Sequence, residues 1–97
     1  MSAPEELRAL RWVAHGRVQG VGFRWYVQNR ARDLGVRGWV RNCDDGAVEV
    51  VGLATGATLE ELDRYVRAGP QGASVTRVTM EQIPHEIVDA KSFVVKH

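Results

Sequence analysis

The sequence predicts an α+β domain in which one sheet carries two helices on one of its faces. Hydrophobic residues alternate with polar ones in segments that predict strands, and recur every three to four positions in segments that predict helices. These segments follow one another in the order strand, helix, strand, strand, helix, strand. Glycine, proline and aspartate mark the points where the spacing changes. A length of 97 residues suits one domain, so we expect a single domain over residues 1–97 with a short flexible lead at 1–7.

The first half of the chain predicts a strand, a helix and a hairpin. Rough alternation over residues 8–18 indicates a strand, and three glycines within 16–22 indicate a loop. A helical stripe follows, and Gly35 stands where a left-handed C-cap is expected. The stripe consists of Phe23, Val27, Ala31 and Leu34. Strands at 36–41 and 48–53 are joined by the turn signal Asp45-Gly46.

The second half predicts one more helix and two strands. Thr58 and Glu61 form a capping box that opens a helix, and Gly69-Pro70 closes it. The buried stripe of this helix consists of Leu59, Leu62 and Val66. Strands at 74–83 and 93–95 follow. This order is that of a ferredoxin-like α/β sandwich (βαββαβ), in which two helices pack on one face of an antiparallel sheet.

Composition excludes several classes of protein. The net charge is only +1, whereas a dedicated nucleic-acid binder usually has a strong basic excess. Eight arginines nevertheless lie in the first 41 residues, which favours a local site for a small anion. Cys43 is the single cysteine, which excludes an intramolecular disulfide and a cysteine zinc site. No apolar run reaches the ~20 residues that span a bilayer. We therefore expect a cytoplasmic monomer that binds no membrane.

The glycine-rich stretch Gly16–Arg24, with the sequence GRVQGVGFR, joins a strand end to a helix start. Successive small residues allow backbone N–H groups to point into one concavity, and the helix N-terminus adds partial positive charge. Arg24 in the first turn can bind two oxygens of the same anion. On residue types alone, a plain tight turn with a solvated Arg24 is the more common outcome. The stretch lacks the Gly-Lys-Ser/Thr of nucleotide-hydrolase loops and the spacing of a dinucleotide fingerprint.

Two segments resemble the signatures of the acylphosphatase family. The stretch Gly16–Arg24 resembles the first signature, and Gly38–Asn42 followed by Gly46–Val50 resembles the second. Further agreement comes from Gly69-Pro70, Ala73, Val75 and Phe93, so that the resemblance covers about residues 8–97. One position departs from the family pattern: shortly after the third strand, where the family usually has glycine, this chain has Ala54, with Gly52 and Gly56 nearby. The family fold agrees with the one predicted from the hydrophobic pattern.

The resemblance implies a hydrolase that cleaves the carboxyl–phosphate bond of acyl phosphates and releases a carboxylate and inorganic phosphate, without a metal or cofactor. It implies that Arg24 binds the phosphate and that Asn42 positions the attacking water. The phosphate-binding loop would consist of Gln19, Gly20, Val21, Gly22, Phe23 and Arg24. For Gln19 itself we expect side-chain hydrogen bonds that shape the loop, with a direct ligand role as the alternative. Without the motif, Asn42 would be interpreted as the start of a turn.

Other chemically suggestive residues have simpler interpretations. We expect the three tryptophans, Trp12, Trp25 and Trp39, to lie in the core or on a sheet face rather than to form a binding platform. Asp44 and Asp45 resemble a carboxylate pair, but their place in a hairpin favours solvated turn residues. His85 and His97 are expected to be solvated.

Three other functions compete with a free-standing acylphosphatase. A nucleic-acid-binding ferredoxin-like domain would stack bases on aromatic residues of its central strands; Val48, Val50 and Val51 occupy those places here, so we expect no nucleic-acid partner. A domain that uses carbamoyl phosphate within a larger maturation enzyme would share the motif, although the end of the chain at His97 favours a separate hydrolase. A non-catalytic domain would not need Arg24 and Asn42.

Overall fold

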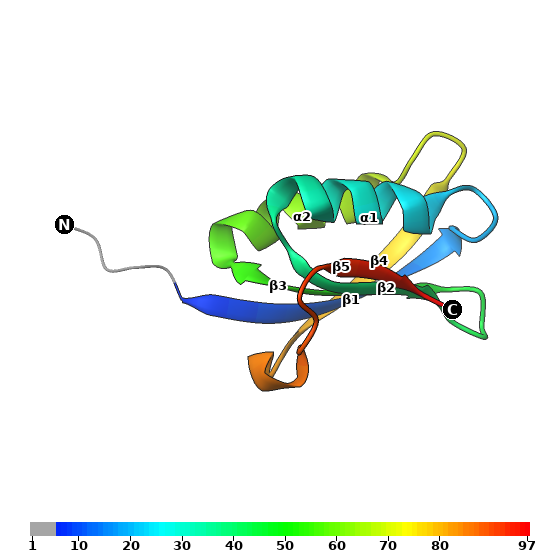
Figure 1. Cartoon of the computed structure of the whole chain (residues 1–97). Helices are drawn as coiled ribbons and strands as arrows, with labels where there is room; N and C mark the ends of the chain where they lie inside the picture. The colour runs from blue at the N-terminus through cyan, green and yellow to red at the C-terminus, as the bar shows by residue number, and fades with distance from the viewer. Residues whose placement is uncertain (1–5) are drawn as a thin grey trace.

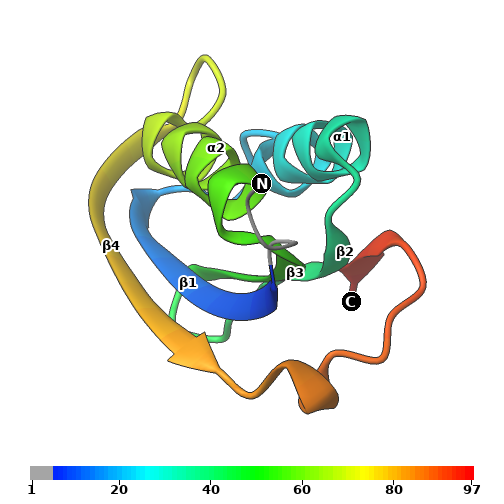
Figure 2. The ribbon, with the colours of Figure 1, turned by 90° about the vertical axis from the view of Figure 1, so that its left-hand side faces the viewer.

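The computed structural model describes residues 6–97, which form one five-stranded sheet with two helices on one face (Figure 1). The elements in chain order are β1 (Leu7–Arg17), α1 (Phe23–Leu34), β2 (Arg37–Asn42), β3 (Val48–Thr55), α2 (Gly56–Ala68), β4 (Ser74–Ile83), the short 3₁₀ helix η1 (His85–Ile87) and β5 (Phe93–Lys96). The predicted order of strands and helices is confirmed. Figure 2 shows α1 and α2 side by side above the sheet and η1 on the other side. Of the predicted lead, residues 1–5 lie outside the described part.

The sheet has the strand order β4-β1-β3-β2-β5 and is mixed rather than purely antiparallel. β1 pairs antiparallel with β3 and β4, and β2 pairs antiparallel with β3. β5 runs parallel to β2, with Gly38 opposite Phe93. The prediction of an antiparallel sheet is therefore wrong at this edge. The physical reason is where β4 ends: Ile83 pairs with Ala9, at the end of the sheet where β2 begins. The connection over residues 84–92 therefore crosses at that end, and β5 starts beside the start of β2.

The helix limits follow from their caps. α1 buries Phe23, Val27 and Ala31 and ends at Gly35, whose φ of 74° confirms the predicted left-handed cap. α2 begins at Gly56, and not after a cap at Thr58 as the capping-box pattern predicts. The N-cap is Thr55, whose Oγ1 accepts a hydrogen bond from the Thr58 backbone N–H at 3.4 Å. The helix therefore starts one turn earlier than expected.

The main core lies between the helices and the sheet. Trp12 is fully buried and its Nε1 donates to Asp63 Oδ1 at 2.9 Å, which ties β1 to α2. The predicted stripe of α2 is also buried; it consists of Leu59, Leu62 and Val66. Trp39 is half-buried on the sheet. Trp25 is 68% exposed, so its predicted place in the core or on the sheet is wrong. Two residues beyond Phe23, it points about 200° around the helix from that buried side chain.

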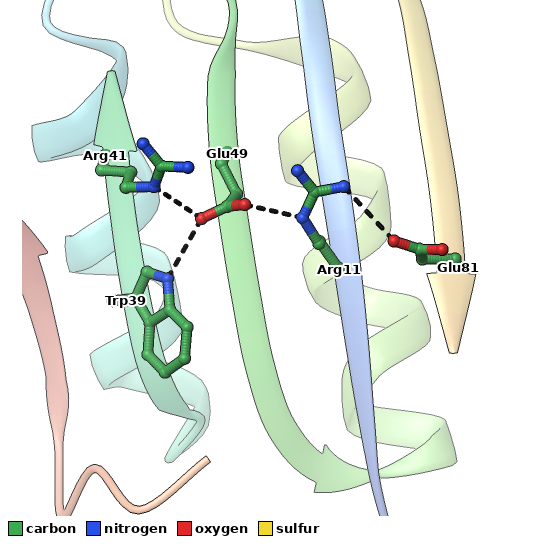
Figure 3. Close-up of polar contacts among 5 residues, drawn as sticks. All are labelled: Arg11, Trp39, Arg41, Glu49 and Glu81. Atoms are coloured by element: carbon green, nitrogen blue, oxygen red, sulfur yellow. Dashed lines mark hydrogen bonds and ion pairs between the residues drawn. The ribbon is translucent and has the colours of Figure 1, made fainter. Parts of the chain in front are cut away.

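The face of the sheet opposite the helices carries an ionic cluster around Glu49 on β3, whose side chain is buried (Figure 3). Its carboxylate accepts from Arg11 Nε at 2.6 Å, Arg41 Nε at 2.8 Å and Trp39 Nε1 at 3.3 Å. Burial alone would raise the pKa of Glu49, but the hydrogen bonds from Arg41, Arg11 and Trp39 outweigh it and leave the pKa lowered. Arg11 also pairs with Glu81 at 3.3 Å, so the cluster links β2, β3, β1 and β4.

Candidate active site

The loop between β1 and α1 presents backbone N–H groups at the start of a helix. Gly20 and Gly22 have φ values of 74° and 79°, which L side chains rarely adopt, and Gly22 is the N-cap of α1. The first helical bond runs from Tyr26 N–H to the Gly22 carbonyl at 3.0 Å. Gly22 has no side chain that could accept from the free N–H groups of the first helical turn, which follow it. That turn also contains no acidic residue. This helix start is therefore suited to bind an anion.

The side chain of Gln19 fastens this loop to the hairpin between β2 and β3. Its Nε2 donates to the backbone carbonyls of Cys43 and Ala47, both at 2.9 Å. The hairpin is itself closed by a hydrogen bond from Cys43 N–H to the Ala47 carbonyl at 2.8 Å. Figure 1 shows the loop and the hairpin at the same end of the molecule. Because both Nε2 hydrogens are engaged, the Gln19 amide nitrogen has no hydrogen left for a phosphate oxygen.

Asn42 is the last residue of β2 and lies opposite Val48 in the sheet. Side chains two apart on a strand share a face, so Asn42 lies on the same side as Val40, which belongs to the core beneath the helices. Its Oδ1 is buried, and no donor within residues 6–97 reaches it. A buried acceptor without a partner costs about 1–3 kcal/mol, so this atom calls for a functional explanation.

Arg24 is the second residue of α1 and follows directly from the loop. It is half-buried, and none of the ion pairs formed within the described residues includes it. Its side chain borders a pocket of about 400 Å³ between α1 and β5. The guanidinium is thus available to an anion at the helix start.

The remaining candidates do not join this group. Asp44 and Asp45 are exposed in the hairpin turn, as predicted, and Asp45 Oδ1 accepts from Ala47 N–H at 3.0 Å. On η1, His85 Nε2 lies 3.2 Å from Glu86 Oε1. Within residues 6–97, no three His, Cys, Asp or Glu side chains gather closely enough to hold a metal ion. In the same part of the chain, no helix has the length and apolar character needed to cross a membrane.

The structure brings the two predicted parts of the site to one end of the sheet, because Gln19 joins the loop before Arg24 to the hairpin after Asn42. Sequence reasoning missed the pocket beside Arg24, to which Trp25 on α1 and Val94 on β5 contribute. A signal was present in the helix: Trp25 is a large apolar residue next to Arg24 and off the buried stripe of α1.

Comparison with known proteins identifies the family. The sequence profile described as acylphosphatase matches residues 10–95. The chain belongs to the acylphosphatase family. It is 54% identical over 68 residues to an acylphosphatase of Cupriavidus pinatubonensis, which covers 70% of this chain and 76% of that one.

Solved acylphosphatases share the fold over nearly the whole chain. The crystal structure of acylphosphatase from Bacillus subtilis superimposes with a TM-score of 0.87 at 32% identity, covering 95% of this chain and 100% of that one. The same fold occurs within a longer protein, T. kodakarensis HypF. Its crystal structure superimposes with a TM-score of 0.80 at 27% identity, and the match covers 93% of this chain but only 12% of that one. The ferredoxin-like prediction is confirmed by these superpositions.

Proposed function

We propose that this acylphosphatase-family chain hydrolyses the carboxyl–phosphate bond of acyl phosphates, with Arg24 and the loop 19–24 holding the phosphate and Asn42 orienting the water. The observation that carries the assignment is the buried, unpaired Oδ1 of Asn42, next to the hairpin to which the loop is fastened. A water molecule that donates to Oδ1 would satisfy this acceptor and would lie at the loop.

The leaving group determines what the site must supply. A carboxylate is stable as an anion at neutral pH, so no general acid is needed to protonate it. The transition state of phosphoryl transfer is loose, and its negative charge is spread over the peripheral oxygens. Catalysis then requires two things: positive or hydrogen-bonding groups around those oxygens, and a water held in line with the bond that breaks.

The helix start meets the first requirement. Backbone N–H groups near Gly22 and the dipole of α1 stabilise the phosphate oxygens, and the Arg24 guanidinium donates to two of them. These donors are fixed by the backbone before substrate binds, so little reorganisation is needed during the reaction.

Asn42 meets the second requirement. Its Oδ1 accepts a hydrogen bond from one O–H of the water, whose oxygen forms a bond to phosphorus as the bond between phosphorus and the carboxylate oxygen breaks. That hydrogen stays on the new P–OH group, and the water's other proton passes to a phosphate oxygen, so the reaction requires no separate base. A neutral amide also avoids repulsion between a carboxylate and the phosphate.

The direct test is hydrolysis of benzoyl phosphate by the purified chain in excess EDTA. We expect turnover that the chelator does not reduce, since a guanidinium and backbone N–H groups bind anions and not metal ions. Inorganic phosphate should inhibit competitively. A folded protein without turnover would contradict the proposed function, and loss of turnover in EDTA would contradict its metal-independent form.

Arg24→Ala tests the assignment of the phosphate-binding residue. We expect the rate to fall by about 10²–10³, as on removal of a preorganised oxyanion donor, together with loss of inhibition by phosphate. Arg64→Ala removes an exposed arginine from α2 and serves as the matched control. Comparable rates for the two folded variants would sink the role of Arg24.

A further inference from the structure

The pocket beside Arg24 has a composition that the phosphate does not explain. It has a volume of about 400 Å³ and lies between the first turns of α1 and strand β5. Its lining residues are Arg24, Trp25, Gln28, Val94, Val95 and His97. One wall is therefore a cation, while much of the rest is apolar.

Two exposed apolar side chains border this pocket. Five large hydrophobic side chains are exposed in the part of the chain that the structure describes, and two of them, Trp25 and Val94, border this pocket. Trp25 is 68% exposed and Val94 is 37% exposed. Exposed apolar residues that adjoin a polar site often contact a ligand.

The position of the pocket relates it to the substrate. In an acyl phosphate only the bridging oxygen separates the acyl carbon from phosphorus, so the acyl group must begin next to the bound phosphate. Arg24 belongs both to the proposed phosphate site and to the pocket wall. The pocket thus adjoins the proposed phosphate site at Arg24.

We propose that this pocket receives the acyl group of the substrate and that Trp25 makes it selective for planar, apolar acyl groups over small ones. This inference rests on the proposed function, since the phosphate must occupy the helix start for the acyl group to reach the pocket. An aromatic acyl group would pack against the Trp25 indole and the Val94 side chain. An acetyl or carbamoyl group is too short to cover the indole.

A second pocket provides the control. It has a volume of about 380 Å³, lies between α2, β1 and β4, and shares no lining residue with the first. Its wall includes Met80, which is 49% exposed. Met80→Ala therefore removes a comparable exposed apolar side chain from a pocket without Arg24.

The experiment compares kcat/KM for benzoyl phosphate and for acetyl phosphate in the full chain and its variants. Trp25→Ala should lower the ratio of kcat/KM for benzoyl phosphate to kcat/KM for acetyl phosphate roughly fivefold, which corresponds to the energy of one aromatic pair. Inhibition by inorganic phosphate should be unchanged. Trp25→Phe should keep most of the ratio, and Val94→Ser should lower it less than Trp25→Ala. Met80→Ala should leave it unchanged.

The outcomes separate the two proposals. An active wild-type protein whose ratio is unchanged in Trp25→Ala and Val94→Ser overturns the acyl pocket and leaves the proposed function standing. A Trp25→Ala variant whose kcat/KM falls equally for both substrates also overturns the proposed selectivity. A folded wild-type protein that hydrolyses neither substrate overturns both proposals. Because Trp25 is exposed, its variants should fold.

Discussion

The Glu49 cluster lies on the sheet face opposite the helices, and the loop end of the sheet is where the loop 19–24 meets the hairpin between β2 and β3. Each buries a polar side-chain group, but the two groups are treated in opposite ways. The Glu49 carboxylate accepts three hydrogen bonds from side chains on the sheet face opposite the helices. Its charge is therefore compensated by groups of the protein. At the loop end, Asn42 Oδ1 has no donor among residues 6–97, and Gly22 leaves the start of α1 without a side-chain cap. Matched groups hold strands together, whereas unmatched groups are available to a ligand.

The difference predicts that mutations in the two regions separate activity from stability. Asn42→Ala should reduce turnover by about 10²-fold, because the water loses its orientation. Inhibition by phosphate should remain, and the free energy of unfolding should stay the same or rise, since the lost buried acceptor has no protein donor. Steady-state kinetics and urea unfolding measure the two effects.

Asn29→Ala on the exposed side of α1 is the control for this variant. If phosphate inhibition vanished in Asn42→Ala but not in the control, Asn42 would be a binding residue.

Glu49→Gln should show the opposite behaviour, with stability lost and turnover retained. Removing the charge weakens the hydrogen bonds from two arginines. Because both arginines are partly exposed, water can solvate them in the variant, and we expect the free energy of unfolding to fall by about 1–3 kcal/mol at neutral pH. Because the pKa of Glu49 is lowered in the folded state, its contribution is present above the ordinary value of 4.5 and disappears as pH falls through the folded pKa.

The gap in unfolding free energy between wild type and Glu49→Gln should therefore narrow below pH 4.5. A gap of constant size down to about pH 2 would show that the charge of Glu49 is not what stabilises the cluster.

Gln19→Ala sharpens the comparison, because Gln19 is paired within the protein yet belongs to the loop end. Loss of its two hydrogen bonds to the hairpin should cost about 1 kcal/mol of stability. Turnover should fall by roughly tenfold, since the loop is no longer fixed relative to the Asn42 hairpin. An unchanged rate in this variant would mean that the backbone alone sets the distance between loop and hairpin.

Much of the fold followed from local patterns in the sequence. Hydrophobic spacing and turn signals identified the strands and the two α-helices, because burial on one face imposes those periods, but they did not predict η1. The patterns did not reveal that β5 runs parallel to β2, since strand direction depends on a partner distant in the chain. They also placed the start of α2 at Thr58. Both Thr55 and Thr58 can cap a helix, and in the structure Thr55 is the cap, since its Oγ1 accepts a hydrogen bond from the Thr58 N–H.

The site was predictable to a smaller extent. The resemblance to acylphosphatases proposed roles for Arg24 and Asn42 that residue types alone did not favour. Local sequence could not show that Gln19 joins two segments more than twenty residues apart, or that β5 completes a pocket with Arg24. Both depend on contacts that form only once the sheet is assembled.

The strand order has a consequence for how fast the molecule folds. β1 lies between β3 and β4, and its Arg17 stands opposite Ser74, so this interior strand gains its partners only after long loops have closed. Domains dominated by such distant pairings fold in roughly milliseconds to seconds, whereas helical bundles fold far faster. Until both neighbours arrive, the edges of β1 can pair with other chains, so refolding yield should fall as protein concentration rises.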